Sequence, residues 1–69
     1  MRVTHDIDKL IEMLQQLQAD GYTQVAAYDD LGYVCPVELE LGHLTEREME
    51  ENQAIKDRQI VIINPYDEN

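Results

Sequence analysis

The hydrophobic period of this chain first changes after Asp20-Gly21, and that change constrains the fold more than any other feature. Before it, apolar residues recur at the spacing of one helical face, namely Ile7, Leu10, Ile11, Leu14 and Leu17. After it, apolar and polar residues alternate with the period of a strand. A helix followed by alternating segments predicts an α+β fold.

The first segment predicts a helix over residues 5–19. Thr4 or Asp6 is expected to cap its N-terminus, where the helix dipole also favours a carboxylate. Asp20-Gly21 is expected to end it, because glycine accepts the left-handed backbone that follows many helices.

Two strands joined by a hairpin are predicted next. Residues 22–28 are rich in β-forming side chains, and residues 33–41 alternate cleanly. Asp29-Asp30-Leu31-Gly32 supplies the turn chemistry of a four-residue hairpin loop. Pro36 cannot donate a ladder hydrogen bond, so the second strand is expected to be an edge strand or bulged there, and Gly42-His43 is expected to end it. The side chains expected to point inward from this strand are Tyr33, Cys35, Val37, Leu39 and Leu41.

The last third of the chain predicts a short helix and a third strand. Thr45-Glu46-Arg47-Glu48 matches a capping box that begins a helix over about residues 46–54. Residues 59–63 form a β-branched strand, and residues 65–69 are expected to fray. The expected architecture is one domain over residues 1–69, with the N-terminal amphipathic helix packed on a three-stranded, mainly antiparallel sheet and the short helix before the last strand.

Residues that could carry out chemistry are few. Cys35 stands at an inward strand position and is interpreted as a core residue, since no base and orienting group accompany it. His5 and His43 are interpreted as capping or exposed residues. The three glycines are isolated and the ligand spacing of metal sites is absent. The sequence therefore predicts no enzyme, no cofactor and no metal. One cysteine and the lack of a signal-like or membrane-spanning segment predict a cytoplasmic protein.

Charge is the most informative feature that remains. The chain has 15 Asp and Glu against 5 Lys and Arg, a net charge of −10, which excludes direct binding to nucleic acid phosphates. Two interpretations stay open: the carboxylates meet a basic surface of a partner protein, in the extreme by mimicking DNA, or they only keep the chain soluble. The candidate partner-binding residues are Asp29, Asp30, Glu38, Glu40, Glu46 and Glu50.

One face of the expected sheet is not covered by the first helix. Val61 and Ile63 belong to a strand that is apolar on both faces, and Tyr22 and Tyr28 are expected to lie on the same open face. Either the second helix covers this face or it is a self-association surface. The second reading makes the protein a small homodimeric structural or regulatory domain.

Four segments carry a resemblance: residues 17–21 at the end of the first helix, and residues 25–30, 37–40 and 60–63 of the strands. In these, the chain resembles small acidic proteins encoded by bacteriophages and prophages. Some of those proteins inhibit host defence systems or host enzymes by binding them, several by looking like nucleic acid. The resemblance implies a non-enzymatic protein that binds a host protein with a basic surface. It carries over no functional residues, because the group has no common site.

Overall fold

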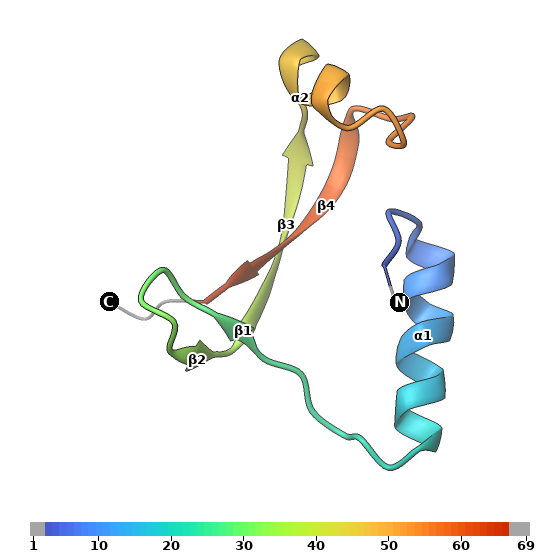
Figure 1. The fold of residues 1–69 in the computed structure, drawn as a ribbon, viewed down its shortest axis with the longest axis vertical. Helices are drawn as coiled ribbons and strands as arrows, with labels where there is room; N and C mark the ends of the chain where they lie inside the picture. Colours follow the sequence, from blue (N-terminus) through green and yellow to red (C-terminus); the bar gives the residue numbers. More distant parts are fainter. Residues whose placement is uncertain (1–2, 67–69) are drawn as a thin grey trace.

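A computed structural model describes residues 3–66 of the chain (Figure 1). Its elements, in chain order, are α1 (Ile7–Ala19), β1 (Ala27–Tyr28), β2 (Val34–Cys35), β3 (Val37–His43), α2 (Glu46–Glu51) and β4 (Gln59–Pro65). The fold is therefore α+β with an N-terminal helix and a short second helix before the last strand. The strands form two separate two-stranded antiparallel sheets, β1–β2 and β3–β4, where one three-stranded sheet was predicted.

The helix α1 begins two residues later than the spacing predicted. Asp6 occupies the N-cap position, but its side chain makes no capping hydrogen bond. The Thr4 side chain instead bonds to the N-cap residue itself: its Oγ1 accepts a hydrogen bond of 3.0 Å from the Asp6 backbone N–H. Thr4 thus orders the approach to the helix, and Asp6 supplies a carboxylate near the positive end of the dipole.

The C-terminus of α1 ends as predicted, with Gly21 at a φ of 106°. The Gly21 N–H donates to the carbonyl of Gln18, and the Tyr22 N–H donates to the carbonyl of Leu17, both at 3.1 Å. These two bonds form a Schellman motif, which uses carbonyls that the helix leaves unpaired.

The β1–β2 hairpin is confirmed, although its first strand is much shorter than predicted. Asp29 builds the loop: its Oδ1 accepts from the backbone N–H groups of Leu31 and Tyr33, both at 2.9 Å. Gly32 has a φ of 85°, which suits glycine at this point of the turn. Residues 22–26 pair with no other strand among the described residues, so the expected strand over 22–28 is reduced to its last two residues.

Pro36, where an edge strand or a bulge was predicted, divides the expected strand into β2 and β3, because it has no N–H to donate to a ladder. The β3–β4 ribbon then runs from the pair Val37–Pro65 to the pair His43–Gln59. The expected strand break at Gly42-His43 is wrong, because both residues belong to β3. The predicted end of the last strand also came too early, since Pro65 is still paired. The Tyr66 N–H donates to the Pro36 carbonyl at 2.7 Å, and the rest of the expected frayed tail, residues 67–69, lies outside the described residues.

The helix α2 starts at the predicted capping box and ends three residues earlier than expected. Leu44, just before it, is buried with 7% of its surface exposed, the one hydrophobic residue of the described chain that is so enclosed. Its backbone N–H donates to the Arg58 carbonyl at 2.8 Å, which continues the β3–β4 ladder. The small core therefore lies where α2 meets the ribbon.

The helix α1 stands apart from most of the β3–β4 ribbon (Figure 1). The helix α1 lies beside the β3–β4 ribbon, and residues 22–26 join it to β1 without regular structure. No side chain of α1 is fully buried, so the expected packing of this helix across a sheet is absent from this chain. The radius of gyration is 14.0 Å, against about 11 Å for a compact domain of this length.

Candidate interaction surface

One face of the β3–β4 ribbon is apolar and exposed. The register places Leu39 opposite Ile63 and Leu41 opposite Val61, and cross-strand partners point to the same side. Leu41 is 92% exposed, Ile63 51% and Val61 39%. We call these four side chains the apolar ribbon face. Leu39 and Leu41 were predicted to point into a core, but no helix covers them here.

The opposite face of the ribbon carries Glu38 and Glu40, as the period of two predicted. Asn64 donates from Nδ2 to Oε2 of Glu40 at 2.8 Å, so one of these carboxylates has a polar partner across the strands. Ile60 and Ile62 share this face and are half-buried, and their side chains lie over the backbone of Gly42, which is opposite Ile60. This face is therefore acidic at one end and apolar at the other.

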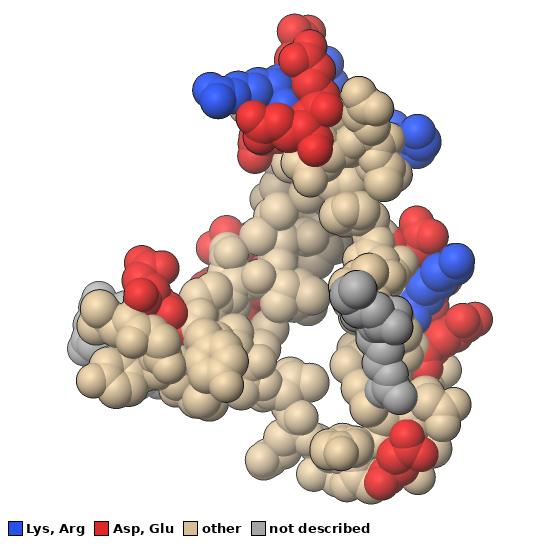
Figure 2. Space-filling view, viewed as in Figure 1, with Lys and Arg blue, Asp and Glu red and all other residues tan. Residues whose placement is uncertain are grey.

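A hollow separates the start of α1 from β4. It has a volume of about 600 Å³ and its apolar lining includes Ile7, Ile55, Ile60 and Val61. A second hollow of about 450 Å³ continues from Ile7 over the Leu41 end of the ribbon. Figure 2 shows open space between the helix and the ribbon. The helix thus approaches the apolar ribbon face at its first turn without closing over it.

The apolar stripe of α1 is also incompletely covered. Ile7, Ile11 and Leu14 are all exposed, with Leu14 at 43%. Leu10 and Leu17 are half-buried. An exposed stripe and an exposed sheet face on one small chain form an apolar surface of the kind that marks protein interaction sites.

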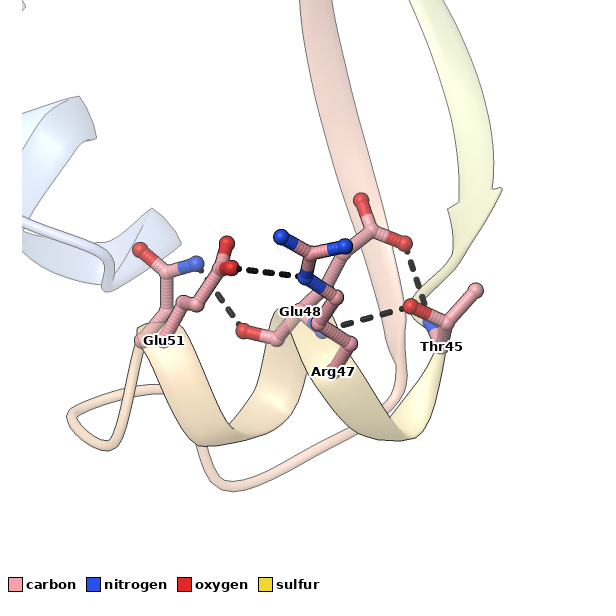
Figure 3. Close-up of polar contacts among 5 residues, drawn as sticks. Thr45, Arg47, Glu48 and Glu51 are labelled. Atoms are coloured by element: carbon pink, nitrogen blue, oxygen red, sulfur yellow. Dashed lines mark hydrogen bonds and ion pairs between the residues drawn. The ribbon is translucent and has the colours of Figure 1, made fainter.

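The acidic candidates on α2 are exposed but stand among cations. Glu46 lies 3.5 Å from the guanidinium of Arg58. Figure 3 shows the second pair, in which Glu51 accepts from Nε of Arg47 at 3.1 Å. Both pairs are largely solvated and contribute little to stability. Glu50 is exposed at the position four residues after Glu46, on the same side of the helix.

Glu48 has a structural role in this segment. Its carboxylate accepts from the Thr45 N–H at 3.0 Å, and its own N–H donates to Oγ1 of Thr45 at 3.2 Å (Figure 3). Hydrogen bonding to Thr45 lowers the pKa of Glu48 below its ordinary value. The backbone of Thr45 has the larger effect and its side chain the smaller one. The predicted capping box is confirmed.

The acidic side chains gather in separate groups rather than in one. Figure 2 shows them over α2, at the loop of the β1–β2 hairpin and along α1, while most of the visible ribbon is uncharged. In the hairpin loop, Asp29 uses its carboxylate to hold the turn, whereas Asp30 is exposed. Asp29 therefore has the turn-forming role predicted for residues 29–32, in addition to being a candidate for partner binding.

The predicted self-association residues divide into two sets. Val61 and Ile63 lie on the apolar ribbon face as expected. Tyr22 follows α1 and belongs to no strand, so it does not lie beside Tyr28 on a strand face as expected. Tyr28 lies in β1, and both tyrosines are exposed.

The remaining side chains that could take part in catalysis or metal binding are the cysteine and the groups of His, Asp and Glu. Cys35 is half-buried, and its Sγ lies 3.5 Å from the Ala27 carbonyl as a weak donor. Over residues 3–66, no three His, Cys, Asp or Glu side chains come together as a metal site requires. Neither helix of that part of the chain is long and apolar enough to cross a membrane.

Two parts of this surface were missed by sequence reasoning. Leu39 and Leu41 were assigned to the interior, although only the amphipathic pattern and not its covering partner can be read from a sequence. The unpaired outer edge of β4 was also missed, because which strand lies beside which depends on contacts between distant segments. The run of β-branched residues at 60–63 was its only local signal.

In comparisons with protein-family models, with curated proteins and with solved structures, nothing matches this chain.

Proposed function

We propose that this protein is a non-enzymatic interaction protein, encoded by a phage or mobile element, that acts in the cytoplasm by binding a larger host protein with a basic surface and inhibiting or modulating it. The observation that supports the proposal is the exposure of its carboxylates. Asp30, Glu38, Glu40, Glu46 and Glu50 are all exposed.

Exposed carboxylates on a chain with a net charge of −10 attract a basic partner over a distance of about 8 Å at physiological ionic strength. Such charges mainly raise the rate of association and select among partners. Glu38 and Glu40 lie two residues apart on one strand face, about 6.6–6.8 Å along it. Carboxylates repeated at such a spacing can occupy a groove that otherwise binds phosphates, which is the form of the proposal in which the protein mimics DNA.

The test starts from proteins that the immobilised chain captures from an extract of the host, identified by mass spectrometry. The captured protein is then purified, and its association rate is measured at nanomolar concentrations of the chain and over a range of salt. We expect the rate to fall steeply with salt. Glu38→Gln/Glu40→Gln and Glu46→Gln/Glu50→Gln should each slow association severalfold with little change in dissociation.

Glu12→Gln/Asp20→Asn is the matched control, because it removes the same charge from α1 and its C-cap. If it slows association as much as the test pairs do, net charge alone attracts the partner and the assigned residues are wrong. Duplex DNA added as a competitor should displace a partner that the chain binds as a DNA mimic. Binding that ignores both salt and the glutamines would leave the acidity as a solubility feature.

A second candidate function is a small homodimeric structural or regulatory domain. The observation that favours it is the exposure of Val61 and Ile63 on the apolar ribbon face. A second copy could cover this face together with the stripe of α1, and the helix-on-sheet packing expected from the sequence would then form in the assembly. The exposed Tyr22 and Tyr28 are the further residues predicted for this contact.

A further inference from the structure

The outer edge of β4 presents unpaired backbone groups. Two backbone hydrogen bonds identify which residue pairs of the ribbon are hydrogen-bonded. The Leu44 N–H donates to the Arg58 carbonyl, and the Tyr66 N–H donates to the Pro36 carbonyl. In an antiparallel ladder, hydrogen-bonded and non-hydrogen-bonded pairs alternate. Even-numbered residues therefore bond across the ribbon, and odd-numbered residues of β4 direct their N–H and C=O groups away from β3. The residues that do so are Gln59, Val61 and Ile63.

We propose that this edge pairs with the same edge of a second copy, antiparallel, about a two-fold axis at Val61. Val61 then faces Val61 of the second copy, and Gln59 faces Ile63. Each of these pairs exchanges two backbone hydrogen bonds. Pro65, which has no N–H to donate, falls outside the ladder. The proposal rests on the self-association described as the second candidate function and is independent of the acidic surface.

Side-chain chemistry selects β4 over β3 for this contact. Pairing β3 with itself in a register centred between Leu39 and Leu41 would place Glu40 opposite Glu40, and centring on Leu39 would place Glu38 opposite Glu40. Like charges directly opposite one another are destabilising. Pairing β4 with itself about Val61 places Ile60 opposite Ile62, which is favourable. A register centred on Leu41 would place Glu40 opposite Gly42, so charge opposes the two β3 registers that bring glutamates together and leaves this one open. No register of β4 with itself brings two charged residues together.

The large exposed surface area of the chain supports a second copy as the partner at this edge. The chain exposes 6430 Å², whereas a compact monomer of 8.0 kDa exposes about 4,500 Å². The excess of about 2,000 Å² per chain is within the range that each partner of an obligate homodimer buries. A second copy is the occupant that accounts for it without another component.

The paired ribbons would form a four-stranded sheet in the order β3–β4–β4–β3. The apolar ribbon faces of the two copies join on one side of it, because the odd-numbered residues of both ribbons point the same way. The hollow beside Ile60 and Val61 is lined on its other side by residues 5–9 at the start of α1. Pairing at this edge therefore requires α1 to move aside, and residues 22–26, which have no regular structure, are where the chain would bend. The stripe of α1 then gains the sheet that it lacks in one chain.

The first test is the mass of the protein in solution. Light scattering of the wild-type chain at high micromolar concentration should give a dimer that dissociates on dilution. A monomer at that concentration would overturn both the edge pairing and the self-association on which it rests. Larger, open-ended assemblies would overturn the closed two-fold arrangement.

The second test is the register, in a Cys35→Ser background. Val61→Cys places two thiols across the axis at a backbone separation that a disulfide can span, about 5.5 Å between Cα atoms. We expect it to form a covalent dimer at least about tenfold faster than Ile63→Cys, whose thiols lie four residues out of register. A dimer in which Ile63→Cys links as fast as Val61→Cys would overturn the register while leaving self-association intact.

Hydrogen exchange of the unmodified chain tests the pairing through β4 even if a cysteine variant does not fold. In a single chain, the N–H groups of Val61 and Ile63 have no partner in the ladder and should exchange rapidly. In the proposed dimer they should exchange at least about tenfold more slowly at high than at low concentration. Rapid exchange at these two positions in a protein that scatters as a dimer would overturn pairing through β4.

Discussion

Gly42 lies in β3 with Ile60 and Ile62 over the space that a side chain would fill. A Cβ at Gly42 would lie 2.8 Å from Cγ1 of Ile62, too close for two carbon atoms. We expect Gly42→Ala to lower the free energy of unfolding by about 1–3 kcal/mol, the usual cost of overpacking. Urea unfolding of the two proteins measures the difference.

A double-mutant cycle identifies the cause. Ile62→Ala removes the clashing atom, so Gly42→Ala should cost much less in that background than in the wild type. Equal costs in both backgrounds would show that Gly42 is needed for some other reason, such as the backbone twist of β3.

Glu48 makes the stability of α2 depend on pH. Its pKa lies below the ordinary value of 4.5 because its carboxylate accepts hydrogen bonds from Thr45. A depressed folded-state pKa contributes stability that is present above the unfolded value and is lost as the pH falls through the lowered one. We expect α2 to lose helicity in that acid range. NMR titration of the Glu48 carboxyl group follows it directly.

Thr45 variants separate the two causes of this shift. Thr45→Ala keeps the backbone N–H but removes the hydroxyl, so the pKa of Glu48 should rise part of the way to 4.5. Thr45→Ser retains the hydroxyl and should keep the pKa low. An unchanged pKa in Thr45→Ala would mean that the Thr45 side chain has no part in the shift.

At the scale of elements, the helix α1 buries none of its side chains fully against the rest of the chain, and Leu14 tests how far its apolar stripe is covered. Leu14 is 43% exposed, so in dilute solution Leu14→Ala should cost about 1 kcal/mol, against about 2–5 kcal/mol for a fully buried leucine. Urea unfolding at low chain concentration measures it. A larger loss at high concentration is expected if α1 packs on a second copy. A loss above about 2 kcal/mol in the dilute chain would show that the stripe is already buried there.

Elements defined by local chemistry could be predicted from the sequence. The capping box at Thr45 and the glycine at the end of α1 depend on neighbouring residues alone, and both are confirmed. The hairpin loop held by Asp29 is of the same kind. Residues 22–26 were predicted as strand from β propensity, but β propensity does not produce a strand where no neighbouring strand is available for pairing. Gly42 was read as a break for the complementary reason: its partner across the ribbon was not known.

The candidate site divides along the same line. That Glu38 and Glu40 share a face follows from the period of two, and so does the common face of Val61 and Ile63. The sequence could not predict which of these faces a helix covers, nor that β4 has a free edge. Leu41, 92% exposed, shows the size of the error: its pattern is that of a core residue, and the covering layer is missing from the single chain.

For the whole molecule, acidity and self-association have to be compatible. A ribbon with two free edges could add copies without end, since pairing at β4 leaves the β3 edge of each copy open. Glu38 and Glu40 lie in that outer strand. Their repulsion would oppose growth through the β3–β3 registers that place two glutamates opposite one another, which gives these carboxylates a role even before any partner is bound.

This role predicts that Glu38→Gln/Glu40→Gln converts the dimer into larger assemblies at high micromolar concentration, because the charges that oppose β3–β3 pairing are gone. Light scattering and sedimentation of fresh protein measure the change. Glu46→Gln/Glu50→Gln removes the same charge from α2, away from the edge, and should stay dimeric. If both variants assemble alike, the effect comes from lower net charge and the carboxylates of β3 have no special position. If neither assembles, the edge of β3 is closed by its shape or by Pro36, and the acidity of this strand is free to serve a partner alone.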